Sequence, residues 1–98
     1  MSADRGSDTI RFRHGLWTFL AVSGPSRLSV RGKPGDLLSL LPLGEDVRDI
    51  SLTGCRFALS GDTLKVGLSR GLSNELSAET ADLDFAAGSL LVIHRGSI

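Results

Sequence analysis

Short runs in which apolar and polar residues alternate, separated by Gly, Pro, Asp and Ser, make up most of the chain. In the first run Ile10 and Phe12 alternate with Arg11 and Arg13, and this period of two predicts a strand with one basic face. The next run, residues 16–22 (LWTFLAV), is apolar on both sides and predicts a central strand that is covered on both faces.

Further strands are predicted along the first half of the chain. Trp17 and Phe19 are expected in the core of the domain, whereas an exposed aromatic pair would suggest an interface anchor. Residues 27–31 alternate again, and the Gly-Lys-Pro-Gly sequence at 32–35 predicts a turn. Residues 47–52 predict another strand.

Two segments are ambiguous. In residues 36–43 Asp36 has the chemistry to cap a helical turn, and Pro42 would end that turn soon afterwards. Residues 70–80 are compatible with either a loop or one short helix. The sequence therefore leaves open whether residues 36–43 and 70–80 are helical.

Two hairpins are predicted in the second half of the chain. Alternating residues at 55–59 and 64–68 flank a Gly-Asp pair at 61–62 that suits a type II′ turn. Residues 82–85 and 89–94 flank an Ala-Ala-Gly sequence in the same way. We therefore expect each pair of segments to form adjacent antiparallel strands.

These patterns predict an all-β fold, a small single-domain sandwich or barrel of short antiparallel strands over residues 9–98. Residues 1–8 are polar and predict an N-terminal arm. A chain of 98 residues has room for one domain. No apolar run approaches the ~18 residues of a membrane span, so no membrane association is expected. The single cysteine, Cys55, excludes an intramolecular disulfide and fits a cytoplasmic protein.

Charge is balanced overall and uneven along the chain. Eleven basic and eleven acidic residues give a formal net charge of +0. Residues 1–33 carry a net charge of +4, and the remaining residues carry −4. Such a division favours self-association or docking on a protein partner, with Arg5, Arg11 and Arg13 as interface candidates. The neutral total and the single tryptophan argue against nucleic acid as a partner.

Catalytic and metal-binding patterns are not recognisable in the sequence. There is no Gly-x-Ser-x-Gly motif, and His14 and His94 both lie at the ends of predicted strands. The His, Cys and Asp residues do not have the spacing of metal ligands. The sequence therefore predicts no catalytic residue, no metal, no cofactor and no enzymatic activity.

Residues 47–57 (VRDISLTGCRF) resemble the Asp/Asn-x-Ser-x-x-Gly strand of PilZ domains. An earlier Arg-x-x-x-Arg pair has the spacing of the arginine pair in that family, although the closing strand of PilZ domains has no counterpart in the C-terminal third. The resemblance implies binding of cyclic di-GMP, in which arginines hold phosphates and Asp and Ser contact a guanine edge. The residues concerned are Arg27, Arg31, Asp49, Ser51 and Gly54.

The functional prediction from sequence is a non-enzymatic structural or assembly protein. A small neutral β-domain of this kind would associate with copies of itself or dock on a larger complex, as virion decoration or cement proteins do. It would reside in the cytoplasm or in a virion assembled there. A PilZ-like cyclic di-GMP-binding domain is the alternative.

Overall fold

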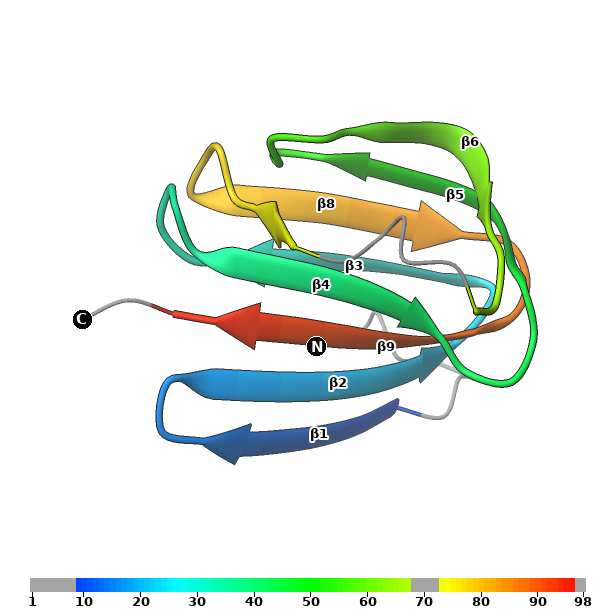
Figure 1. Ribbon diagram of the computed structural model, residues 1–98, viewed down its shortest axis with the longest axis horizontal. Coiled ribbons are helices and arrows are strands. Elements are labelled where there is room, and N and C mark those ends of the chain that lie inside the picture. Colours follow the sequence, from blue (N-terminus) through cyan, green and yellow to red (C-terminus); the bar gives the residue numbers. More distant parts are fainter. Residues whose placement is uncertain (1–8, 68–72, 97–98) are drawn as a thin grey trace.

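The computed structural model describes residues 9–67 and 73–96, and it confirms the predicted all-β sandwich. Two antiparallel sheets pack face to face (Figure 1). The strands in the described ranges are β1 (Thr9–His14), β2 (Trp17–Ser23), β3 (Ser26–Arg31), β4 (Leu37–Pro42), β5 (Val47–Thr53), β6 (Leu59–Leu64), β7 (Asn74–Glu75), β8 (Thr80–Phe85) and β9 (Ser89–Arg95). No helix in these ranges is long and apolar enough to cross a membrane.

The sheets are assembled from strands that are distant in sequence. Sheet A has the order β1-β2-β9-β4-β7, and sheet B has the order β3-β8-β5-β6. The chain therefore crosses from one sheet to the other after β2, β3, β4, β6, β7 and β8. As a consequence the C-terminal strand β9 lies in the centre of sheet A, between β2 and β4.

The core consists of the apolar side chains that alternate strands direct between the sheets. Core members that are at most 2% exposed include Leu38, Leu40, Leu90 and Val92 from sheet A and Val47, Ile50, Leu52, Leu64, Ala81 and Leu83 from sheet B. Burying one of the Val, Leu or Ile side chains stabilises the fold by about 1.5–3 kcal/mol.

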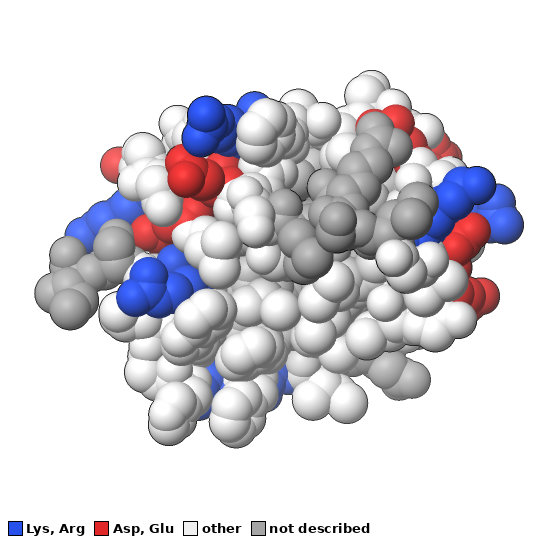
Figure 2. Space-filling model, viewed as in Figure 1, with Lys and Arg blue, Asp and Glu red and all other residues white. Residues whose placement is uncertain are grey.

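The outer face of sheet A is apolar and partly exposed. Trp17 and Phe19 were expected in the core, and this prediction is wrong: both are half-buried on the outer face, with ring centroids 6.1 Å apart. Ile10 and Phe12 continue this face onto β1, where they are 69% and 59% exposed. Figure 2 shows this side of the molecule as largely uncharged over the lower strands, with charged groups gathered near the margins. The prediction of a covered strand at 16–22 therefore holds for one face only.

Both predicted hairpins are wrong. Residues 61–62 lie inside β6 and do not form a turn. Strand β6 pairs instead with β5, and the connection between these two strands lies at residues 54–58. The positive φ of Gly61 (61°) accompanies the irregular register between β5 and β6. The second prediction fails because β8 belongs to sheet B and β9 to sheet A.

The ambiguous segments are not helical where the structure describes them. Residues 37–42 form β4, which pairs along its whole length with β9. Residues 73–80 contain the short strand β7 and the start of β8, while residues 70–72 lie outside the described part. In both cases pairing with a neighbouring strand satisfies the backbone groups.

The charge division along the sequence is only partly kept in space. On sheet B, Arg27 of β3 lies opposite Asp84 of β8, and the Ser29 hydroxyl donates to the Asp82 carboxylate at 2.6 Å. Basic and acidic segments are therefore interleaved on that sheet. Arg11 and Arg13 on β1 have no such acidic neighbour in register, since they lie opposite Leu20 and Thr18.

Candidate functional site

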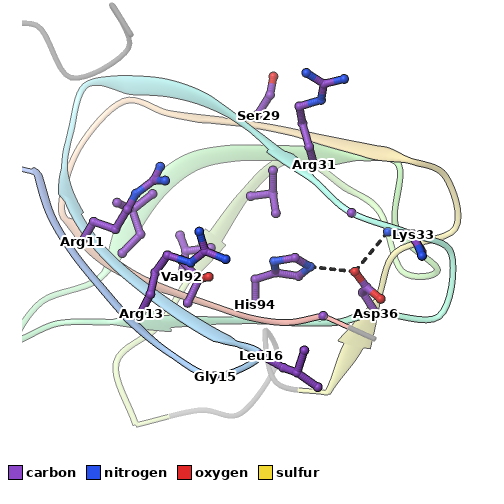
Figure 3. A pocket seen from close by; sticks show the side chains of 15 residues that line it. Arg11, Arg13, Gly15, Leu16, Ser29, Arg31, Lys33, Asp36, Val92 and His94 are labelled. Atoms are coloured by element: carbon purple, nitrogen blue, oxygen red, sulfur yellow. Dashed lines mark hydrogen bonds and ion pairs between the residues drawn. The ribbon is translucent and has the colours of Figure 1, made fainter. Parts of the chain in front are cut away.

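A cleft opens between the sheets where β1 faces β3 (Figure 3). We call it the β1–β3 cleft. Its volume is about 710 Å³, within the range of ~300–1,000 Å³ that small-molecule sites occupy. The cleft arises because five-stranded sheet A extends past the β3 edge of four-stranded sheet B. Its lining includes Arg11, Arg13, Thr18, Val30, Val92 and His94.

A hydrogen-bonded pair of buried residues lies at one end of the cleft. His94 Nε2 donates to Asp36 Oδ2 at 2.8 Å, and the Lys33 backbone N–H donates to the same oxygen at 3.0 Å. The side chains of Asp36 and His94 are 2% and 16% exposed. A Cβ at Gly32 would lie 2.5 Å from Asp36 Oδ2 and 2.8 Å from His94 Nε2. Because glycine has no Cβ, position 32 leaves room for Asp36 and His94 to pack against its backbone.

The backbone of an exposed aromatic residue is held by a buried amide at the β7 edge of sheet A. Asn74, which is 6% exposed, accepts hydrogen bonds through Oδ1 from the backbone N–H groups of Phe57 (3.0 Å) and Glu75 (2.9 Å). Its Nδ2 donates to the Phe57 carbonyl at 2.8 Å. One side chain thus fixes both backbone polar groups of Phe57, whose ring is 61% exposed. We call Phe57 and Asn74 the aromatic platform.

The aromatic platform has the chemistry to bind a flat, positively charged ring. A large apolar side chain that is exposed on a fixed backbone is typical of a contact surface. The guanidinium carbon of Arg56 lies 5.5 Å from the centroid of the Phe57 ring, so one cation is already accommodated there. A heteroaromatic cation would add stacking to the same electrostatic attraction.

The residues of the PilZ resemblance are only partly brought together. Arg27 and Asp49 line a shallow hollow on the outside of sheet B. Arg31 lies four residues farther along β3, opposite Thr80, and is not part of that hollow. A Cβ at Gly54 would clash with the Thr80 backbone, so the glycine serves close strand packing. Ser51 accepts a hydrogen bond from the Gly61 backbone N–H at 3.0 Å.

The interface candidates separate into two groups. Arg5 lies outside the described residues. Arg11 and Arg13 line the β1–β3 cleft. The association with a protein partner that was expected from these residues stays a prediction.

Metal and thiol chemistry have little support in the described part of the chain. No group of three or more His, Cys, Asp or Glu side chains there is arranged to hold a metal ion. Cys55 is buried, and desolvation raises the pKa of its thiol from 9.0 to about 11. At neutral pH it therefore remains a protonated, unreactive core residue.

Sequence reasoning missed the aromatic platform and the Asp36–His94 pair. Phe57 was assigned to an ordinary alternating strand, and nothing in its alternation distinguishes an exposed aromatic residue from a buried one. Asn74 is the only asparagine of the chain, and this was a usable signal, because an isolated amide often fixes an irregular backbone. The contact between Asp36 and His94 joins residues 58 positions apart and has no local signal.

Comparison with known proteins identifies the family of this sandwich. Residues 25–90 match the family model described as thiamin pyrophosphokinase, vitamin B1 binding domain. A curated thiamine pyrophosphokinase of Bacillus subtilis is 32% identical over 56 residues, which are 57% of this chain and 26% of that protein. The matched residues thus span about a quarter of the length of this curated relative.

Solved structures show the same fold. The crystal structure of thiamine pyrophosphokinase from Bacillus subtilis matches with a TM-score of 0.81 at 22% identity. The match covers 92% of this chain and 42% of the Bacillus subtilis chain. The enzyme from Geobacillus thermodenitrificans gives a TM-score of 0.71 at 23% identity, with 83% and 38% covered. A thiamin pyrophosphokinase family protein from Enterococcus faecalis gives 0.72 at 22% identity, with 90% and 40% covered.

These matches overturn the functional predictions made from sequence. The predicted non-enzymatic assembly role, with its comparison to virion proteins, is wrong, because the matched family is named for an enzyme. The prediction that the protein is not an enzyme is contradicted by the same matches. The PilZ-like alternative is also replaced, since the family match covers the segment on which that resemblance rested. The error arose because a binding domain can lack every catalytic motif and still belong to an enzyme family.

Proposed function

The chain belongs to the thiamin pyrophosphokinase vitamin B1 binding domain family, and on that premise we propose that it binds thiamin as the substrate-binding β-domain of a thiamin pyrophosphokinase. The observation that carries the proposal is the family match over residues 25–90. Both residues of the aromatic platform fall inside this segment, whereas Arg11, Arg13 and His94 of the β1–β3 cleft fall outside it. The platform is therefore the better candidate for thiamin.

Thiamin fits the chemistry of the platform. It carries an aminopyrimidine and a positively charged thiazolium, both flat rings. The exposed Phe57 ring offers a stacking surface to either ring, and its face attracts the thiazolium charge with about 0.5–2 kcal/mol. Asn74 acts as a positioning residue, because it fixes the Phe57 backbone without contacting the face of the ring.

The proposed role of this chain is substrate binding. Transfer of a pyrophosphoryl group requires groups that orient the donor phosphates and neutralise their charge. The relatives are more than twice as long as this chain, so further parts of such an enzyme have room for those groups. What Phe57 and Asn74 supply is the orientation of the acceptor, which lowers the entropic part of the barrier.

Calorimetric titration with thiamin tests the proposal. We expect saturable binding by the chain, and a loss of about tenfold in affinity for Phe57→Ala, which corresponds to roughly 1.4 kcal/mol. Phe57→Trp keeps a stacking surface and is expected to bind at least as tightly as the wild type. Val66→Ala, which also truncates an exposed apolar side chain (50% exposed), is the matched control and should bind unchanged. Wild-type affinity in Phe57→Ala would contradict the assignment.

Two expectations from sequence remain predictions. Association with a protein partner or with a second copy is compatible with the apolar outer face of sheet A and has not been tested. A cytoplasmic location is supported by the single buried thiol and by membership of a metabolic enzyme family.

A further inference from the structure

We propose that the β1–β3 cleft binds a phosphate-bearing anion, with Arg11 and Arg13 as the residues that hold it. The two arginines are two positions apart on β1, so they lie on the same face with Cα atoms about 7 Å apart. In Figure 3 both side chains reach over the cleft, whereas Ser29 and Arg31 on the opposite wall point away from it. Two guanidinium groups therefore converge on one cavity.

The placement of these arginines is unusual for the inner side of a sandwich. Their register partners on β2 are Thr18 and the buried Leu20, and the cleft wall behind them also contains Val30 and Val92. Neither arginine forms an ion pair with any residue in the described ranges. Each therefore has its guanidinium donors available beside a partly apolar wall. A guanidinium group can donate two parallel hydrogen bonds to two oxygens of one phosphate group. Phosphate is therefore the ligand that this arrangement favours.

The acidic group at the cleft is already hydrogen-bonded to its own partners. Asp36 lies in the lining and would repel an anion if its carboxylate faced the cavity freely. Its Oδ2 instead accepts hydrogen bonds from His94 and from the Lys33 backbone, and the side chain is 2% exposed. Arg11 and Arg13 are exposed, so an anion would reach them from solvent without displacing Asp36. The local excess of positive charge occurs in a chain whose formal net charge is +0.

The anion site is separate from the aromatic platform. In the register of sheet A, Asn74 pairs with Leu38, Leu38 with His94, His94 with Thr18, and Thr18 with Arg13. Four strand spacings of ~4.8 Å place Asn74 and Arg13 about 19 Å apart. Anion binding is thus independent of the proposed thiamin contact with Phe57. The phosphate group would belong either to free pyrophosphate or to a phosphorylated organic molecule.

Titration of the chain with inorganic pyrophosphate at low ionic strength, followed by calorimetry and by NMR, tests the site. We expect saturable binding that weakens with added salt and shifts the resonances of Thr18, Val30 and Val92. Arg11→Gln and Arg13→Gln should each lower the affinity about tenfold. Arg56→Gln removes an exposed arginine elsewhere and should bind pyrophosphate unchanged. Urea denaturation of each variant confirms that the fold is retained, which we expect because both cleft arginines are exposed.

A second titration, of the Phe57→Ala variant with thiamin diphosphate and with pyrophosphate, distinguishes the two sources of phosphate, because this variant lacks the proposed thiamin contact. Equal affinity for both compounds would identify the free anion as the ligand, and tighter binding of thiamin diphosphate that requires Arg11 and Arg13 would identify the ester. Phe57→Ala should leave pyrophosphate binding unchanged, so failure of the thiamin proposal would not affect this result. The proposal is overturned if no saturable binding occurs up to about 10 mM pyrophosphate, or if Arg56→Gln weakens binding as much as the cleft variants.

Discussion

Asn74→Ala tests whether one buried amide holds the backbone that carries the exposed Phe57 ring. The Asn74 side chain makes three hydrogen bonds, two to the backbone of Phe57 and one to the backbone of Glu75. Alanine removes all three and leaves partly buried backbone groups without a protein partner. Each lost bond lowers the free energy of unfolding by about 0.5–1.5 kcal/mol, so we expect a total loss of about 2–4 kcal/mol.

Urea denaturation followed by circular dichroism measures this loss. A decrease of 2 kcal/mol corresponds to a fall in melting temperature of at least about 8 °C for a domain of this size. Glu75→Ala is the matched control, because Glu75 lies in the same two-residue strand with an exposed side chain. Its free energy of unfolding should stay within about 0.5 kcal/mol of the wild type.

The same variant separates positioning from contact. At a temperature where Asn74→Ala is still folded, its affinity for thiamin should be lower, because the Phe57 backbone is no longer fixed. Phe57→Ala should lose affinity with little loss of stability, since its ring is 61% exposed. If Asn74→Ala unfolds at the same urea concentration as the wild type, the role assigned to the amide is refuted.

Three further predictions concern the core and the cleft. Leu38→Ala should lower the free energy of unfolding by about 2–5 kcal/mol, because the Leu38 side chain is 0% exposed. Leu43, which is 42% exposed, provides the control, and Leu43→Ala should have a small effect in the same urea experiment. Gly32→Ala should lower the free energy of unfolding by about 1–3 kcal/mol, because its Cβ would clash with Asp36 and His94. Gly96→Ala is the control and should be tolerated, because its Cβ would meet only the Leu16 carbonyl at 3.8 Å. Equal stability of the two variants would contradict the clash. Burial raises the pKa of the Cys55 thiol from 9.0 to about 11, so the unfolded chain loses this proton first and stability should fall as pH rises from 9 towards 11. Cys55→Ala should show a smaller fall over that range in denaturation curves, and an identical pH dependence would speak against the shift.

Local pattern was sufficient for the fold class and for several strands. Alternation in residues 10–13 and 27–31 predicted the strands β1 and β3, because successive side chains of a strand point to opposite faces. It did not predict that the apolar residues Ile10 and Phe12 of β1 lie on the exposed outer face. Residues 36–43 were left open, because Asp36 and Pro42 have local preferences that pairing with β9 overrides. A strand receives most of its stabilisation from neighbours that are remote in sequence.

Strand pairing was beyond the reach of local pattern. The Gly-Asp pair at 61–62 has the composition of a hairpin turn, yet these residues lie within β6, where Gly61 takes a positive φ in a strand of irregular register. Likewise β8 and β9 are joined by a short connection and belong to different sheets. Turn composition constrains only the local backbone, whereas the choice of partner depends on which faces are buried together in the whole sandwich.

By itself, then, the sequence determined that this protein is a small, neutral, all-β domain with a single cysteine. Only the tertiary structure decided that Arg11 and Arg13 face a cleft, that Asp36 meets His94, and that Phe57 is exposed on a backbone fixed by Asn74. Alternation identifies two faces of each strand without telling which face is covered. That is decided by the number and order of strands in the opposing sheet, and here sheet B has one strand fewer than sheet A, which leaves the inner side of β1 open.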